Sequence, residues 1–142
     1  PTIVQGIVKA LFVGVPGESL VKKERDFLRA EMDGFAGDRH ASFQRKAWGA
    51  GDKQPKGIIR RNERQWSAVS QAELESISQE MDLSEVLSAG SIGANLCVAG
   101  VPSFSLIPKG SIFRFPSIYF KVPRLSHSMS WCISCIYKYL FY

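Results

Sequence analysis

The segment "FAGDRHAS", Phe35 to Ser42, places an acid, an arginine and a histidine side by side after a glycine. Gly37 allows a sharp turn or a close approach to a ligand. Arg39 can donate two hydrogen bonds to one oxyanion, and His40 can donate to a phosphate or orient a neighbour. Asp38 could hold Arg39 or accept from a ligand N–H group. The segment indicates either the rim of an anion site or a solvated Asp–Arg pair worth under ~1 kcal/mol.

A second basic cluster lies in "RRNERQW", which contains Arg60, Arg61, Arg64 and Gln65. Arg64 and Gln65 stand where a loop leads into a predicted strand. Neighbours along a strand point to opposite faces, so strand geometry allows at most one of these two side chains to face a given cavity. The cluster could contribute to an anion site, or it could be only the charged start of a strand.

A third group lies in "GANLCV", where Asn95 follows Gly93 at a corner. An Asn amide can both donate and accept hydrogen bonds, which suits a ligand site. Cys97 lies two residues further on and would share a strand face with Asn95. A buried cysteine that acts as a small apolar side chain and a reactive thiol are both open for this position.

Cys132 and Cys135 have the C-x-x-C spacing, but one pair without a second pair or paired histidines is weak support for zinc. We therefore predict no metal site. The sequence also lacks G-x-S-x-G, the P-loop, H-E-x-x-H and G-x-G-x-x-G. Enzyme class stays open at this point.

The bulk composition is that of a globular protein: 142 residues, 45% hydrophobic, 22% charged, with a formal net charge of +5. A basic balance suits an anionic partner, which could be a nucleic acid, a membrane surface or a phosphorylated small molecule. No apolar run reaches the roughly 18 residues of a spanning helix. An odd number of cysteines and no recognisable secretory signal predict reduced thiols and a cytoplasmic location.

Short segments rich in β-branched residues, divided by glycine and proline, predict a mainly-β fold of the barrel or sandwich kind with one or two helices. Predicted strands cover Ile3–Gly14, residues 64–70, 95–101 and 110–115, and residues 42–55 form a polar loop. Leu74, Ile77, Ser78 and Met81 follow the 3.6-residue period and predict a helix over Gln71–Met81. Ser70 and Glu73 have the spacing of a capping box at its start.

The last segment, residues 116–142, differs from the rest because it contains neither acidic residues nor glycine and is crowded with aromatic residues and serines. It could be a folded terminal strand, or a tail outside the evolved reading frame. We therefore predict one domain over residues 1–115 followed by an atypical tail.

Taken in order, "DGFAGDRHA", "RNERQWSAVSQAELESI" and "GANLCVAGVPSFSLIPKGSIFRF" resemble the MOSC domain, named for the C-terminal domain of molybdenum cofactor sulfurase. The resemblance runs from about residue 6 to residue 115. It implies a β-barrel-like fold that binds the molybdenum cofactor (molybdopterin). It further implies sulfur transfer or molybdenum-dependent reduction of N-hydroxylated compounds. No pyridoxal phosphate is expected on this chain, so a separate sulfur donor protein would be needed.

The motifs of the resemblance identify the residues that would bind the cofactor. These are Gly37, Asp38, Arg39, His40, Arg64, Gln65 and Asn95. Members of that family present a cysteine in a Pro-Cys setting after the last of these strands. Here the segment reads "PSIYFKVPRLSHSMSWCISC", so Cys132 and Cys135 are only weak candidates for that role.

Three functions are therefore open from the sequence. The first is an enzyme that handles the molybdenum cofactor, and the second is a non-catalytic module that binds an anion or cofactor after loss of the reactive cysteine. The third, binding of nucleic acid, is the least favoured because Phe43, Trp48 and Trp66 form no repeated basic–aromatic platform. No membrane partner is expected.

Overall fold

The computed structural model describes residues 2–17, 19–49, 52, 54–108, 111–115 and 118–121. Its centre is a four-stranded sheet in the order β2-β1-β8-β7. The bounds of these strands are β1 Ile7–Val13, β2 Lys23–Arg25, β7 Ala68–Ser70 and β8 Leu96–Ala99. β1 pairs antiparallel with β2 and β8, whereas β7 runs parallel to β8. The predicted strands in these regions are confirmed, although each is shorter than expected.

The helix α1, Gln71–Glu80, connects β7 to the long return toward β8 and confirms the helix predicted from the sequence. Leu74, Ile77 and Ser78 are its buried residues, as the 3.6-residue period requires. The capping box is wrong: Ser70 caps the helix without a side-chain hydrogen bond. Glu73 instead accepts from the backbone N–H of Ser105 at 2.8 Å and ties α1 to the segment after β8.

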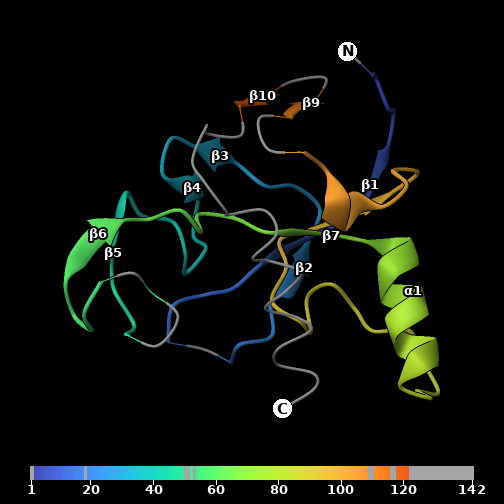
Figure 1. Cartoon of the computed structure of the whole chain (residues 1–142), viewed down its shortest axis with the longest axis horizontal. Helices are drawn as coiled ribbons and strands as arrows, with labels where there is room; N and C mark the ends of the chain where they lie inside the picture. Colours follow the sequence, from blue (N-terminus) through green and yellow to red (C-terminus); the bar gives the residue numbers. More distant parts are fainter. Residues whose placement is uncertain are drawn as a thin grey trace.

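Three two-stranded sheets surround the centre (Figure 1). They pair β3 Ala30–Glu31 with β4 Gly34–Phe35, β5 Gln44–Lys46 with β6 Ile59–Arg61, and β9 Ile112–Phe115 with β10 Ile118–Lys121. The prediction of a loop over residues 42–55 is therefore wrong for Gln44–Lys46, which form β5. Its sequence, Gln-Arg-Lys, shows no apolar alternation because the strand is not packed on a core, so the usual strand signal is missing.

Two apolar clusters lie on the central sheet. One contains Phe12, Val69, Leu74 and Cys97, and the other contains Phe35, Leu96, Val98 and Phe104. The mainly-β class is confirmed, but the strands of the described residues do not close into a barrel. Among the described residues, no helix is long and apolar enough to cross a membrane. The domain boundary at residue 115 stays a prediction, because most of the tail lies outside the described residues.

Candidate functional site

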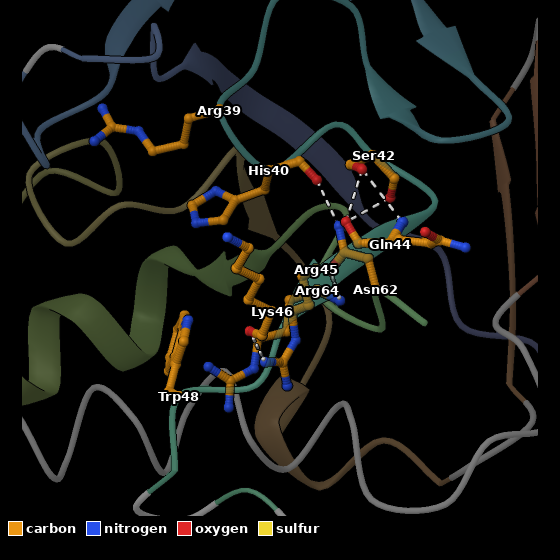
Figure 2. Close-up of a pocket in the computed structure, with 9 residues that line it drawn as sticks. All are labelled: Arg39, His40, Ser42, Gln44, Arg45, Lys46, Trp48, Asn62 and Arg64. Atoms are coloured by element: carbon orange, nitrogen blue, oxygen red, sulfur yellow. Dashed lines mark hydrogen bonds between the residues drawn. The ribbon is translucent and has the colours of Figure 1, made fainter. Parts of the chain in front are cut away.

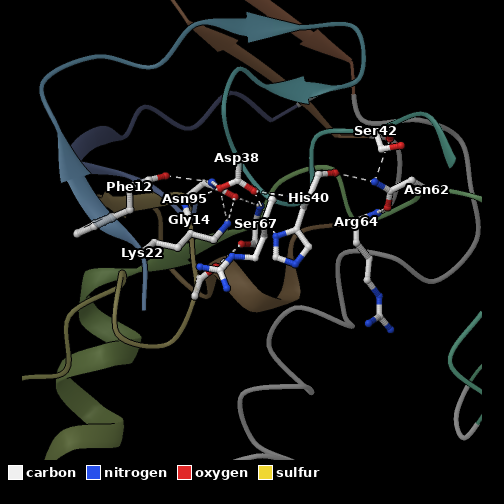
Figure 3. A network of polar contacts seen from close by, with 12 residues as sticks. Phe12, Gly14, Lys22, Asp38, His40, Ser42, Asn62, Arg64, Ser67 and Asn95 are labelled. Atoms are coloured by element: carbon white, nitrogen blue, oxygen red, sulfur yellow. Dashed lines mark hydrogen bonds and ion pairs between the residues drawn. The ribbon is translucent and has the colours of Figure 1, made fainter. Parts of the chain in front are cut away.

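A buried polar cluster joins three distant parts of the chain (Figure 3). Lys22 Nζ donates to Asp38 Oδ2 at 2.9 Å and to Asn95 Oδ1 at 2.8 Å. Asn95 Nδ2 donates in turn to Asp38 Oδ2 at 2.8 Å and to the carbonyl of Phe12 at 3.0 Å. The side chains of Lys22 and Asp38 are 1% and 0% exposed. A buried ion pair of this kind stays charged only because hydrogen bonds satisfy both partners.

Asp38 connects this cluster to His40. Burial alone would raise the pKa of Asp38, but hydrogen bonds from His40, from the Gly14 N–H and from Lys22 outweigh it and hold the pKa well below its usual range. Asp38 Oδ1 lies 3.2 Å from His40 Nδ1 and also accepts from the His40 N–H at 2.9 Å. The ionised carboxylate thus favours a proton on Nδ1 and leaves Nε2 available to a ligand.

Asn62 joins the first predicted motif to the second. Its amide donates to the carbonyls of His40 and Ser42 at 2.7 and 3.0 Å, and its Oδ1 accepts from the Arg64 N–H at 3.0 Å. The Asn62 residue is only 6% exposed. This one buried amide brings the segments around His40 and Arg64 side by side, and sequence reasoning did not identify it.

Beside Asn62, an open hollow of about 220 Å³ lies in the surface (Figure 2). Its lining residues are Arg39, His40, Ser42, Gln44, Arg45, Lys46, Trp48, Asn62 and Arg64. Four of these nine side chains are cationic, and none of the nine is acidic. A concave surface lined in this way concentrates positive potential and favours an anionic ligand of small size.

Arg39 lies at one edge of this hollow and is positioned by the loop after β1. Its guanidinium donates to the carbonyl of Ser19, and its backbone N–H donates to the Gly14 carbonyl at 2.6 Å. A Cβ atom on Gly14 would come within 2.6 Å of Arg39 Nε. Gly14 is therefore required for this close approach, and in Figure 2 the guanidinium turns away from Arg64.

Arg64 lies on another side of the hollow, where its guanidinium is 4.5 Å from the ring centroid of Trp48. Arg45 lies 5.3 Å from the same ring and donates twice to Asp52, at 2.7 and 2.9 Å. Hydrogen bonds from Arg45 and from the Trp48 N–H hold the pKa of Asp52 well below its usual range. Because Asp52 offsets the charge of Arg45 and the Arg39 guanidinium turns toward Ser19, the positive potential of the hollow comes mainly from Lys46 and Arg64.

The structure divides the predicted site residues into two groups. Arg39, His40 and Arg64 line the same hollow, whereas Asp38 and Asn95 lie in the buried cluster. Gly37 has a φ of +79° and supplies the turn expected of it.

Gln65 also does not line the hollow. Its amide donates to the Ser42 carbonyl at 3.3 Å and supports the wall from outside. Sequence reasoning missed Lys22 entirely, because it begins the charged run "KKER", whose other members are exposed, and this gives no sign of burial.

Cys97 is a buried core residue, 9% exposed, which confirms the apolar alternative. Burial, with a smaller effect of Glu75, raises the pKa of its thiol. We therefore expect a Cys132→Ser/Cys135→Ser variant to react with Ellman's reagent at least tenfold more slowly when native than when unfolded in guanidinium. Equal rates in both states would contradict this description of Cys97. Cys132 and Cys135 themselves lie outside the described residues.

Among the described residues, no group of three or more His, Cys, Asp or Glu side chains is arranged to hold a metal ion. The hollow offers cations and hydrogen-bond donors in place of metal ligands. What it can do chemically is bind and orient an anion.

No protein-family model matches the chain. YuaD of Bacillus subtilis (strain 168) is 33% identical over 100 residues, which are 70% of this chain and 52% of that protein. Its name assigns it, as a candidate, to metal-sulfur cluster biosynthesis. The chain spans about half the length of this relative.

The crystal structure of the YuaD protein from Bacillus subtilis is also similar to this chain. The two agree with a TM-score of 0.71 and 27% sequence identity, over 80% of this chain and 63% of that one. The likeness therefore includes the fold as well as the sequence.

These comparisons contradict the MOSC assignment. The relative is named for metal-sulfur cluster biosynthesis, so the molybdenum cofactor, its sulfur transfer, the reduction of N-hydroxylated compounds and the link to a pyridoxal phosphate-associated family are set aside. The geometry supplies a physical reason. Asp38 and Asn95, two residues of the motifs behind that assignment, are engaged in a buried cluster that supports the fold. Part of each motif therefore reflects this scaffold, while Arg39, His40 and Arg64 line the hollow.

Proposed function

We propose that this chain binds a small anion in a step of metal-sulfur cluster biosynthesis. The observation that carries the proposal is the hollow lined by Arg39, His40, Lys46 and Arg64 with no acidic side chain among its nine lining residues. The biosynthetic context comes from the name of the Bacillus subtilis relative. The proposed ligand class is a small oxyanion or sulfur-bearing anion, and the metal or cluster enters as substrate.

The donors of the hollow come from three segments and suit an anion. His40 lies after β4 and offers Nε2, and Lys46 belongs to β5. Arg64 is supported through its backbone by Asn62 and through its side chain by Trp48. Charge-assisted hydrogen bonds contribute about 1.5–3 kcal/mol each, so two or three of them can give specific binding of a small ligand.

Titration calorimetry with phosphate and with thiosulfate tests the proposal. Arg64→Gln is expected to weaken binding of the better anion by about tenfold or more, because it removes one charge-assisted donor. Arg61→Gln is the matched control, since Arg61 is exposed and outside the hollow. Equal weakening by both substitutions, or no binding of either anion at millimolar concentration, would overturn the proposal.

We further propose that a separate sulfur donor protein acts with this chain. Sulfur must be supplied to any metal-sulfur centre, and the relative's name places it in such a pathway. We propose the cytoplasm as the location, because the sequence contains an odd number of cysteines, which suits reduced thiols.

A further inference from the structure

The net charge of this chain is concentrated in one part of the fold. Residues 43–64 contain seven of the 18 Lys and Arg residues but only two of the 13 acidic residues. The other 120 residues contain eleven of each kind and carry no formal net charge. The whole excess of +5 therefore belongs to the β5–β6 hairpin and its connections, which Figure 1 shows at the opposite end of the molecule from α1.

One face of this hairpin is exposed along both strands. Gln44 pairs with Arg61 and Lys46 pairs with Ile59, so these four side chains share a face. All four residues are exposed, and Ile59 is 55% exposed. We call these four residues the hairpin face. It places one aliphatic side chain between two cations.

Further large apolar side chains are exposed elsewhere on the hairpin and its connections. They are Phe43 at 61%, Trp48 at 53% and Ile58 at 50%. Strand alternation places Ile58 on the opposite face from Ile59, so Ile59 is the aliphatic side chain that the hairpin face itself offers. Aromatic and aliphatic anchors surrounded by charged residues are typical of protein interfaces.

The opposite face of the hairpin is rigidly supported. Arg45 and Arg60 face each other across the pair, and both donate to Asp52, at 2.7 Å and 2.9 Å for Oδ1. Asp52 also accepts from the Trp48 N–H at 2.7 Å. This single carboxylate joins both strands to the loop between them. The hairpin face is thus presented in a defined geometry, which reduces the entropy lost on binding.

We propose that the hairpin face docks an acidic segment of a partner protein that carries an apolar anchor. Charge complementarity selects the acidic partner, and the exposed Ile59 selects a protein. Protein–nucleic acid interfaces are more polar and stack bases on aromatic side chains, and the four residues of the hairpin face include no aromatic residue. The proposal does not depend on anion binding in the hollow. Gln44 and Lys46 belong to both surfaces, so the docked segment would lie beside the hollow.

The test uses a fluorescein-labelled synthetic peptide rich in Asp and Glu with a central Leu-Phe pair, followed by fluorescence anisotropy. Arg61→Glu is expected to weaken peptide binding about tenfold or more, and Ile59→Ser about threefold or more. Arg25→Glu, a charge reversal at an exposed position of β2, is the matched control and should change binding less than twofold. An unchanged thermal unfolding midpoint of Arg61→Glu and Ile59→Ser shows that the fold is intact.

Three outcomes would overturn the docking proposal. Arg25→Glu could weaken binding as much as Arg61→Glu, which would show only general charge attraction. An acidic peptide without the Leu-Phe pair could bind as tightly as the complete one. A single-stranded oligonucleotide, or a vesicle of anionic phospholipid, could bind more tightly than the peptide and be unaffected by Ile59→Ser. If the unmodified protein binds the peptide but binds neither phosphate nor thiosulfate, docking is supported and only the anion proposal is overturned.

Discussion

Lys22→Met is expected to lower the free energy of unfolding by about 3–5 kcal/mol, as seen when one partner of a buried ion pair is removed. Lys22 donates to both Asp38 and Asn95, and the side chains of the ion pair are at most 1% exposed. Methionine fills similar space but leaves the Asp38 carboxylate buried without its cation. Urea denaturation at neutral pH measures the difference between the variant and the unmodified protein.

The control for Lys22→Met is Glu31→Gln, which removes a surface pair with Arg29 whose side chains are 74% and 44% exposed. Its effect should stay below about 1 kcal/mol. The double variant Lys22→Met/Asp38→Asn should recover part of the lost stability, because no uncompensated charge remains. A penalty for Lys22→Met as small as that of the control would show that the cluster is not buried as described.

The loss of stability at low pH depends on the same Asp38 carboxylate. Because the folded-state pKa of Asp38 is depressed, its contribution is present above the ordinary carboxyl pKa of about 4. That contribution is lost as the pH falls further toward the folded-state value. The penalty of Lys22→Met should therefore shrink in acid, where the buried carboxyl group of the variant is protonated.

Asn95→Asp should be destabilising by about 3 kcal/mol or more at neutral pH. Asn95 is 0% exposed, and its Nδ2 donates to Asp38 Oδ2 at 2.8 Å. The substitution replaces this donor with a second carboxylate, and two carboxylates this close cannot both ionise without a large penalty. The folded state then raises the pKa of the introduced carboxyl group. Its penalty is absent below about pH 4 and grows as the pH rises toward that raised pKa.

Thermal denaturation from pH 4 to pH 8 measures this dependence. Gln79→Glu makes the same amide-to-carboxylate change at an exposed position of α1, and its effect should stay within about 0.5 kcal/mol at every pH. The sign of the pH dependence is decisive. The introduced carboxyl group should lower stability as the pH rises, whereas Asp38 itself contributes more stability as the pH rises. A penalty that does not vary with pH would mean that the introduced group is solvated.

The sequence predicted the elements whose signals are local. The helix over residues 71–80 follows from the spacing of Leu74, Ile77 and Ser78, and β1 follows from its β-branched composition. The β5 strand was missed because Gln44, Arg45 and Lys46 are not packed on a core and show no alternation. Strand prediction from periodicity works only where one face is buried.

The sequence predicted only some of the site residues, because burial is not visible in a short motif. Arg39, His40 and Arg64 were identified by their chemistry, and they do line one hollow. Asp38 and Asn95 were expected at a ligand but lie in the buried cluster, because short motifs do not reveal which side of the backbone is covered. Lys22 and Asn62 were missed, since the groups to which their side-chain nitrogens donate lie 16 or more residues away in the chain.

The pairing of β1 with β8 has a consequence for how the chain is made. Ile7 lies opposite Ala99, so β1 can pair with β8 only after about ninety further residues have been synthesised, although its other neighbour, β2, follows it closely in the chain. During synthesis on the ribosome, the apolar segment "IVKALFV" is complete long before β8 exists. Folding dominated by such distant pairings is slow, and unpaired strands promote aggregation meanwhile. We therefore expect the nascent β1 segment to need protection from aggregation until β8 has been synthesised.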